Sequence, residues 1–333
     1  DYGTSSALDN TNKVLVGGRF QETVEFDPGS NTDDKTSHGG SDGVLLCFDL
    51  DGTYNWARSF GGPNRDFVWA LDINDQNETI LTGYFNETCD FDPGPNSFNI
   101  TSQGVNNMFV SKFNSAGDFI QAVAALGEGE IVPNDVYIDS NSSIFITGYF
   151  LETVDFDPGP DVVSRTSTGF DDIFLLKLKD DLEFQSIITY GSADVDRGNS
   201  VILDDLDNIL LSGEFSETVD FDPGTGSTNL SSNGSRDVFL LKLKPEALSR
   251  DDFNSDTDFQ YYPNPTSGIL NISFGSMETR IDMVIYDVTG KLVDKKQFYN
   301  RENISYYLPG STGLKLVQLT TNDSSTSFKV IKN

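Results

Sequence analysis

The stretch Gly148-Tyr-Phe-Leu-Glu-Thr-Val-Asp-Phe-Asp-Pro-Gly159 decides the fold of this chain, because its pattern occurs four times. The closing tetrapeptide Phe-Asp-Pro-Gly begins at residues 26, 91, 156 and 221, so each copy follows the last by 65 residues. A period this regular predicts one structural unit that is built four times. A binding site on such a protein is expected where units meet, or on loops that the units share.

One unit, residues 127–191, has the composition of short β-strands. Residues 134–139, 144–150, 173–178 and 183–190 are rich in β-branched and aromatic side chains, which predicts four strands. Residues 153–156 form a further short extended stretch that the Asp-Pro-Gly turn closes, which predicts an additional hairpin between the second and third strands. Four antiparallel strands per repeat without helices predict an all-β protein made of β-propeller blades. A β-solenoid and a string of separate small sandwiches are the alternatives.

The repeats occupy residues 1–250, with units at about 1–61, 62–126, 127–191 and 192–250. Insertions are nearly absent; we expect one of two residues in the second unit, between Asp72 and Gly83. The chain begins in mid-repeat, so we expect it to be the C-terminal part of a longer propeller. The fourth unit is expected to lack its last strand, and a strand upstream of residue 1 would then close the ring.

The recurrent carboxylates are interpreted as structural, because a catalytic pair is usually unique and these acids occur four times. In this interpretation the aspartate caps the Pro-Gly turn through its side chain, and the phenylalanine anchors the hairpin. The turn comprises Phe26, Asp27, Pro28, Gly29, Phe91, Asp92, Pro93, Gly94, Phe156, Asp157, Pro158, Gly159, Phe221, Asp222, Pro223 and Gly224.

The net charge of −30 is unevenly distributed over the 333 residues. Residues 259–333 carry 8 Lys and Arg against 6 Asp and Glu, whereas residues 1–258 carry 14 against 46. Acidic repeats repel nucleic acid and anionic lipid, and they suit an extracellular setting. No apolar run is long enough to span a membrane.

The sequence offers little catalytic chemistry. The single histidine, His38, lies beside two glycines and is expected at the surface, and no nucleophile, phosphate-loop or zinc motif is present. We therefore expect no catalytic residues and no cofactor, although a glycosidase pair among the carboxylates stays open. Weak calcium candidates are Asp72, Asn74, Asp204 and Asp207. Cys47 and Cys89 are either one bridge between adjacent units or two free thiols.

The repeats resemble a known class of secreted propeller. The elements Val44–Phe48, Trp56-Ala57, Gly61-Gly62, Ala70–Asp72 and Thr82–Phe85 resemble the SBBP type of β-propeller repeat. The Glu-Thr-Val-Asp-Phe-Asp-Pro-Gly segment resembles a variant found in secreted proteins of the Bacteroidota. Trp56 departs from the repeat, since Gln121 and Ser186 stand at the equivalent positions.

Residues 251–258 are polar and acidic and predict a linker, and residues 259–333 predict a small Ig-like β-sandwich of six to seven short strands. The strands are expected at residues 269–274, 281–287, 291–298, 304–308, 314–319 and 328–331. Four motifs, Y-P-N-P-T-S-G at 262–268, I-Y-D-V-T-G-K at 285–291, L-P-G-S-T-G-L at 308–314 and F-K-V-I-K at 328–332, resemble the type A C-terminal sorting domain of the type IX secretion system. The signal residues are Tyr262, Pro263, Asn264, Pro265, Gly268, Tyr286, Asp287, Gly290, Lys291, Gly313, Lys329 and Lys332.

This resemblance implies export through the periplasm and outer membrane to the cell surface or the medium. It also implies recognition of residues 259–333 by the translocon and an outer-membrane shuttle protein, and removal of the domain when cargo is attached. We expect the repeats to be a non-enzymatic module that binds a protein or glycan. The alternative is an extracellular carbohydrate-active hydrolase or lyase whose catalytic residues lie upstream or among the carboxylates.

Overall fold

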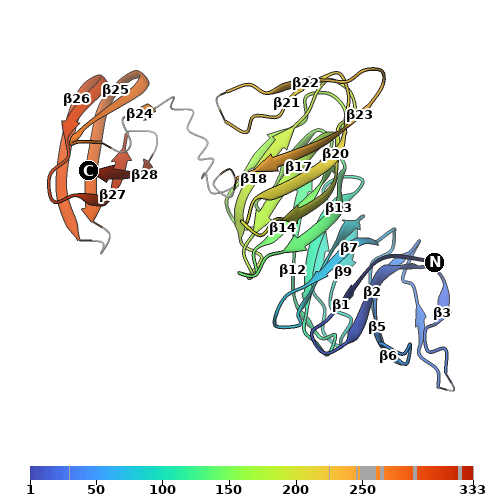
Figure 1. Cartoon of the computed structure of the whole chain (residues 1–333). Coiled ribbons are helices and arrows are strands. Elements are labelled where there is room, and N and C mark those ends of the chain that lie inside the picture. Colours follow the sequence, from blue (N-terminus) through green and yellow to red (C-terminus); the bar gives the residue numbers. More distant parts are fainter. Residues whose placement is uncertain are drawn as a thin grey trace. The chain divides into compact units, whose positions relative to one another are not determined.

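The computed structural model describes residues 1–29, 31–224, 226–244, 247, 260–262, 266–287, 291–321 and 325–332 (Figure 1). The chain divides into two compact units, Asp1–Asp251 and Asp252–Asn333. All the secondary-structure elements in the described ranges, β1 to β28, are strands. This confirms the predicted all-β fold class of propeller blades followed by a small β-sandwich. The predicted linker at residues 251–258 lies outside the described residues.

The first unit is built from consecutive antiparallel sheets, one for each repeat (Figure 1). The first sheet is β1 (Tyr2–Leu8), β2 (Lys13–Phe20), β5 (Asp42–Asp49) and β6 (Tyr54–Phe60); the second is β7 (Phe67–Ile73), β8 (Thr79–Phe85), β11 (Asn107–Phe113) and β12 (Phe119–Gly127). The third is β13 (Ile131–Ile138), β14 (Ile144–Phe150), β17 (Asp172–Leu178) and β18 (Phe184–Tyr190). The fourth is β19 (Arg197–Leu203), β20 (Ile209–Phe215) and β23 (Asp237–Leu243), so within the described residues it has three strands.

The turn after the first strand of each blade corrects the predicted insertion in the second unit. Asp9, Asn74, Asp139 and Asp204 occupy the same place in four equivalent turns, each 65 residues from the next. In each, the backbone N–H three residues on donates to the carbonyl of the capping residue, at 2.9–3.2 Å. An insertion follows only if Asp72 is equated with Asp139, but the equivalent of Asp72 in the third unit is Tyr137. The second unit therefore has no insertion.

Each repeat also forms the expected short hairpin. The four hairpins are β3 (Thr23–Glu25) with β4 (Asp34–Thr36), β9 (Thr88–Asp90) with β10 (Asn99–Thr101), β15 (Thr153–Asp155) with β16 (Ser164–Thr166), and β21 (Thr218–Asp220) with β22 (Asn229–Ser231). The hairpin of the third repeat does not extend its own blade. It pairs with β12 of the preceding blade, where Leu126 lies opposite Asp155 and Gly127 opposite Val154.

The same pairing occurs one junction earlier, where Gly61 and Asp90 exchange two backbone hydrogen bonds of 3.2 and 3.1 Å. The hairpin of the fourth repeat contacts the third blade through Phe221, whose ring lies 5.4 Å from that of Tyr190. Each of these hairpins therefore connects its own blade to the blade before it.

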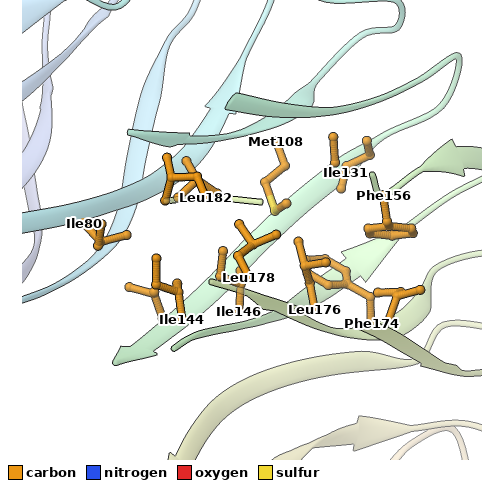
Figure 2. Close-up of a cluster of buried hydrophobic side chains, with 14 of the residues drawn as sticks. Ile80, Met108, Ile131, Ile144, Ile146, Phe156, Phe174, Leu176, Leu178 and Leu182 are labelled. Atoms are coloured by element: carbon orange, nitrogen blue, oxygen red, sulfur yellow. The ribbon is translucent and has the colours of Figure 1, made fainter. Parts of the chain in front are cut away.

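The hydrophobic core lies between successive sheets. Figure 2 shows the cluster between the second and third blades, where Ile80 and Met108 face Ile146, Leu176 and Leu178. Phe156 belongs to this cluster and is completely buried, with its ring 5.3 Å from that of Phe174. A comparable cluster joins the first and second blades, and another joins the third and fourth. Because a single sheet has too little apolar contact of its own, each blade depends on its neighbours.

Among the described residues of this unit, no further sheet covers one face of the first blade and one face of the last blade. Phe26 is only half-buried, whereas its equivalents Phe91, Phe156 and Phe221 are at most 2% exposed. On β23, Val238 and Leu240 are 85% and 76% exposed, although their equivalents in the third blade, Ile173 and Leu175, are fully buried. These are the two faces that a further blade of the same kind would cover.

The described residues of the second unit form one antiparallel system of five strands around their own core. They are β24 (Gln260–Tyr262), β25 (Ile269–Asp287), β26 (Leu292–Tyr307), β27 (Gly313–Thr320) and β28 (Ser325–Lys332). The strands expected at 269–274 and 281–287 are one long strand, as are those at 291–298 and 304–308. The register of β25 with β26 shifts between Ser273 and Glu278, and β25 pairs with β24 in its first half and with β27 in its second. Buried residues of both halves, such as Ile272 and Met283, therefore share one core.

We expect replacement of Phe156 by alanine to destabilise the repeat unit by about 3–5 kcal/mol, because it leaves a cavity between two blades. Phe26→Ala is the matched control, since Phe26 has the same place in the repeat but is half-buried. Urea denaturation of both variants measures the difference. Equal losses for the two variants would contradict the role of this phenylalanine as an inter-blade contact.

Candidate functional site

The Phe-Asp-Pro-Gly turns are closed by the aspartate side chain. In all four copies the aspartate Oδ1 accepts a hydrogen bond from the glycine N–H, at 2.7 Å for Asp27, Asp157 and Asp222 and 2.8 Å for Asp92. The acid two residues earlier joins the two ends of the loop: Asp155 Oδ1 accepts from the N–H groups of Asp157 and Val163. These carboxylates have structural partners.

The recurrent glutamates at the start of each hairpin also have a backbone role. Glu22, Glu87, Glu152 and Glu217 all adopt a left-handed conformation, with φ between 50° and 66°. Their carbonyl oxygens accept hydrogen bonds from serine N–H groups on the opposite strand, at 2.7–3.1 Å. This backbone conformation turns the chain into the hairpin, which is why the position recurs.

Two pairs of buried aspartates lie at junctions between blades, and sequence reasoning missed them. Asp42 and Asp66 lie between the first and second blades, and Asp172 and Asp196 between the third and fourth. Burial, with the charge of the second aspartate, raises the pKa of Asp66 and of Asp172 to about 7. One sequence feature could have revealed these pairs: Asp66 and Asp196 are 130 residues apart, which is twice the repeat length.

The junction between the second and third blades has no aspartate at these positions. Asn107 stands at the position of Asp42 and Asp172, and Ile131 at that of Asp66 and Asp196. The Asn107 amide donates from Nδ2 to the carbonyl of Gly127 at 3.0 Å, and its Oδ1 accepts from the N–H of Gln103 at 2.8 Å. An amide can donate here, and a carboxylate can do so only when it is protonated. The environment of this position therefore favours a neutral side chain.

The calcium candidates do not converge on one point. Asn74 and Asp204 cap equivalent turns, and Asp204 Oδ1 accepts from the N–H groups of Leu206 and Asn208, both at 2.9 Å. Asp72 accepts from the N–H of Ile138 in the next blade at 2.7 Å, and Asp207 has a left-handed backbone in its turn. Among the described residues, no three Asp, Glu, His or Cys side chains are grouped as metal ligands.

The two cysteines and the histidine have ordinary surroundings. Cys47 and Cys89 are free thiols buried in the core between the first and second blades, and burial raises the pKa of both. His38 is exposed, and its Nδ1 lies 2.7 Å from Asp42 Oδ2.

A polar cavity of about 420 Å³ lies at the junction of the first two blades. Its wall combines Arg58 of β6 and Lys35 of β4 with the second Phe-Asp-Pro-Gly loop, which contributes Asp92 and Asn96. Arg58 is held in place by the carbonyls of Ala116 and Gly117, at 3.1 and 3.0 Å, and its guanidinium lies 4.9 Å from the centre of the Trp56 ring.

The basic residues of this cavity are not repeated at the next junction. One repeat further on, Ile100 and Val123 replace Lys35 and Arg58, and Gln121 replaces Trp56. Sequence reasoning recorded Trp56 as a departure from the repeat, but it did not connect Trp56 with Arg58 or with the loop of the next unit.

In the second unit, three of the four sorting motifs come together. Thr266 donates its N–H to the carbonyl of Ile331 at 2.8 Å, and Leu308 donates its N–H to the carbonyl of Gly268 at 2.7 Å. Lys332 is 8% exposed, and its Nζ donates to the carbonyls of Leu308 and Gly310 at 2.8 and 2.9 Å. The first, third and last motifs therefore form one hydrogen-bonded cluster.

The second motif lies on the adjoining strand. Asp287 and Lys291 close a turn, in which Asp287 donates its N–H to the Lys291 carbonyl at 3.0 Å, and Tyr286 pairs with Leu316. Gly313 begins β27 with a φ of 119°. Of the predicted signal residues, Pro263, Asn264, Pro265 and Gly290 lie outside the described residues, and Tyr262 and Lys329 are described by their backbone alone.

The comparison with known families identifies this second unit. Residues 260–333 match the family model described as the secretion system C-terminal sorting domain. The class of protein is therefore cargo of the type IX secretion system, which is exported to the cell surface or the extracellular space. No helix among the described residues is long and apolar enough to cross a membrane.

Two individual proteins are similar to parts of this chain. An uncharacterized WD repeat-containing protein of Acanthamoeba polyphaga mimivirus is 22% identical over 206 residues, which cover 53% of this chain and 14% of that protein. A crystal structure of dimeric latent PorU from Porphyromonas gingivalis aligns with 12% identity and a TM-score of 0.20, covering all of this chain and 32% of that one. The chain thus spans a minor part of both proteins.

We expect Asp172→Asn to stabilise the repeat unit at pH 8 by up to about 4 kcal/mol. The folded-state pKa of Asp172, about 7, lies above its ordinary value of 3.8. The wild type therefore loses stability as the pH rises between these values, and asparagine does not titrate.

Thermal melting from pH 4 to pH 8 measures this effect, and the two proteins should converge near pH 4. Asp237→Asn is the control, because Asp237 has the same place in the repeat but is only half-buried. A variant that is no more stable than the wild type at pH 8 would show that this aspartate is ionised without cost.

Proposed function

We propose that this chain is a secreted propeller whose repeat unit binds a glycan without catalysis. Its last domain is the signal that the type IX translocon and its outer-membrane shuttle protein read. Removal of the domain when cargo is attached to the cell surface belongs to the same proposal. The observation that carries the export route is the match of residues 260–333 to the sorting-domain family.

The cavity between the first two blades supports a binding role. It presents donors, Lys35 and Arg58, beside acceptors, Asp92 and Asp118, and the Asn96 amide supplies both. Such a mixed set suits the hydroxyl groups of a sugar, which donate and accept in turn. Lys35 and Arg58 of its wall are not repeated at the next junction, which favours a specialised site.

The distribution of carboxylates favours binding over hydrolysis. The acids that recur in every unit cap turns or join loop ends. The two raised-pKa pairs occur at two junctions, and Asp66 and Asp196 are completely shielded from solvent. A glycosidase needs a pair that contacts substrate, and repeated, enclosed pairs serve that purpose poorly.

We expect deletion of residues 260–333 to abolish export in a bacterium that has the type IX system, with the propeller accumulating in the periplasm. Immunoblots of medium, surface and periplasmic fractions measure the distribution, and a strain without the translocon is the control. Continued export of the truncated chain would show that the signal lies elsewhere.

We expect the double variant Lys35→Ala/Asn96→Ala to weaken glycan binding at least about tenfold, as loss of two hydrogen-bonding side chains implies. Binding of the purified chain to a glycan array identifies the ligand and measures the loss. Arg165→Ala is the matched control, because Arg165 stands at the position of Lys35 two repeats later. A wild type that binds no glycan, or an equal loss in the control, would contradict this site.

A further inference from the structure

The sorting domain carries an exposed apolar surface that its own packing does not use. Leu292, Leu314, Leu316 and Ile331 are 55%, 39%, 40% and 44% exposed. Together with the half-buried Tyr286 they form what we call the motif patch.

The strand register brings these five residues onto one face. Leu292 of β26 lies opposite Tyr286 of β25, and Tyr286 lies opposite Leu316 of β27. Leu314 precedes Leu316 by two residues, so the two side chains point to the same face, and Leu314 lies opposite Ile331 of β28. The patch thus crosses four adjacent strands.

The opposite face of the same strands already supplies the core. Ile285, Val317 and Val330 alternate with the patch residues and are completely buried. Further along the patch face, polar side chains such as Asp282 and Gln318 take over. The apolar character is therefore confined to one end of the face, where folding alone does not require it.

The patch coincides with the sorting motifs. Tyr286 belongs to the second motif, Leu314 ends the third, and Ile331 lies in the last. Leu292 directly follows the second motif, and Leu316 lies two residues beyond the third. Residues far apart in the sequence meet on one surface, beside the cluster that Lys332 joins.

We propose that the motif patch is the surface through which the sorting domain docks on an apolar face of a protein of the secretion machinery. This inference rests on the proposed function, because the family match is what supplies a partner. It adds the location of the contact and its chemistry, which is desolvation of leucine, isoleucine and tyrosine side chains on one sheet face.

The test compares three forms of the full chain in a type IX-competent bacterium. The polar form, Leu314→Thr/Leu316→Thr/Ile331→Thr, keeps β-forming residues but removes the apolar surface. The apolar form, Leu314→Ile/Leu316→Ile/Ile331→Val, keeps that surface. The control, Met277→Thr/Tyr299→Thr, removes side chains that are 67% and 56% exposed outside the patch.

We expect the exported fraction of the polar form to fall at least about tenfold, from the apolar area lost to docking. The apolar form and the control should stay within about twofold of the wild type, which is close to the resolution of such a comparison. Thermal melting of the purified chains confirms folding. Should the polar form not fold, the single variants Leu316→Thr and Ile331→Thr are each expected to reduce export about threefold.

Normal export of the polar form would overturn the inference, and so would a loss of export in the apolar form as large as in the polar form. Binding of the wild type to phosphatidylcholine vesicles that the polar form loses would also overturn it, by assigning the patch to lipid. The proposed function fails separately, when the wild type itself is exported from a strain that lacks the translocon.

Discussion

The contact between successive blades is the constraint on which the repeat unit depends. A sheet of four short strands has little core of its own, so its apolar face is buried only when the next sheet covers it. The phenylalanine of each Phe-Asp-Pro-Gly turn supports this contact. Phe91, for example, lies between Phe60 of the first blade and Phe109 of the second, with ring centres 5.7 and 5.0 Å away. The turn recurs because each junction is packed around the same phenylalanine. The aspartate cap fixes the turn of the hairpin from which this phenylalanine projects.

The need to pack successive blades together also explains which positions differ between the repeats. At the middle junction the buried acids are replaced together, by Asn107 and Ile131, which removes a pair whose ionisation is costly. At the first junction Lys35 and Arg58 line a polar cavity. Trp56 packs against the buried cluster, and the centre of its ring lies 4.9 Å from the Arg58 guanidinium. The packing between blades thus recurs from repeat to repeat, whereas the residues at the rim of the junction differ, and the rim is where we propose that a ligand binds.

The sorting domain is not built from repeats. Hydrogen bonds between its sequence motifs hold it together. The buried ammonium group of Lys332 connects the end of the chain with the loop at Leu308–Gly310, so the last motif completes the fold of the domain. The strong acidity of the repeats does not extend to this domain, where positive and negative side chains are nearly balanced. The two units therefore differ in composition.

Much of this organisation was predictable from the sequence. Spacing and residue type gave β14 its bounds, the hairpin its place and the tail its family, because these features depend on neighbours within about ten residues. The sequence did not predict that the tail strands merge into the long strands β25 and β26. Whether two extended segments continue as one strand depends on how they pair with their neighbours, and the local residue pattern does not show this. The residue that caps the turn in the second unit is Asn74, and the sequence alone does not single it out because Asp72, Asn74 and Asp75 are chemically alike.

The sequence by itself determined the four-unit period, the turn chemistry and the export signal, since each is written in short contiguous motifs. Only the tertiary structure decided that the hairpins pair with the preceding blade, that two aspartate pairs share buried junctions, that a cavity opens at the first junction, and that sorting motifs share one surface. Each of these brings together residues that belong to different strands or different blades. Such meetings depend on how sheets pack against one another, and no local pattern specifies that packing.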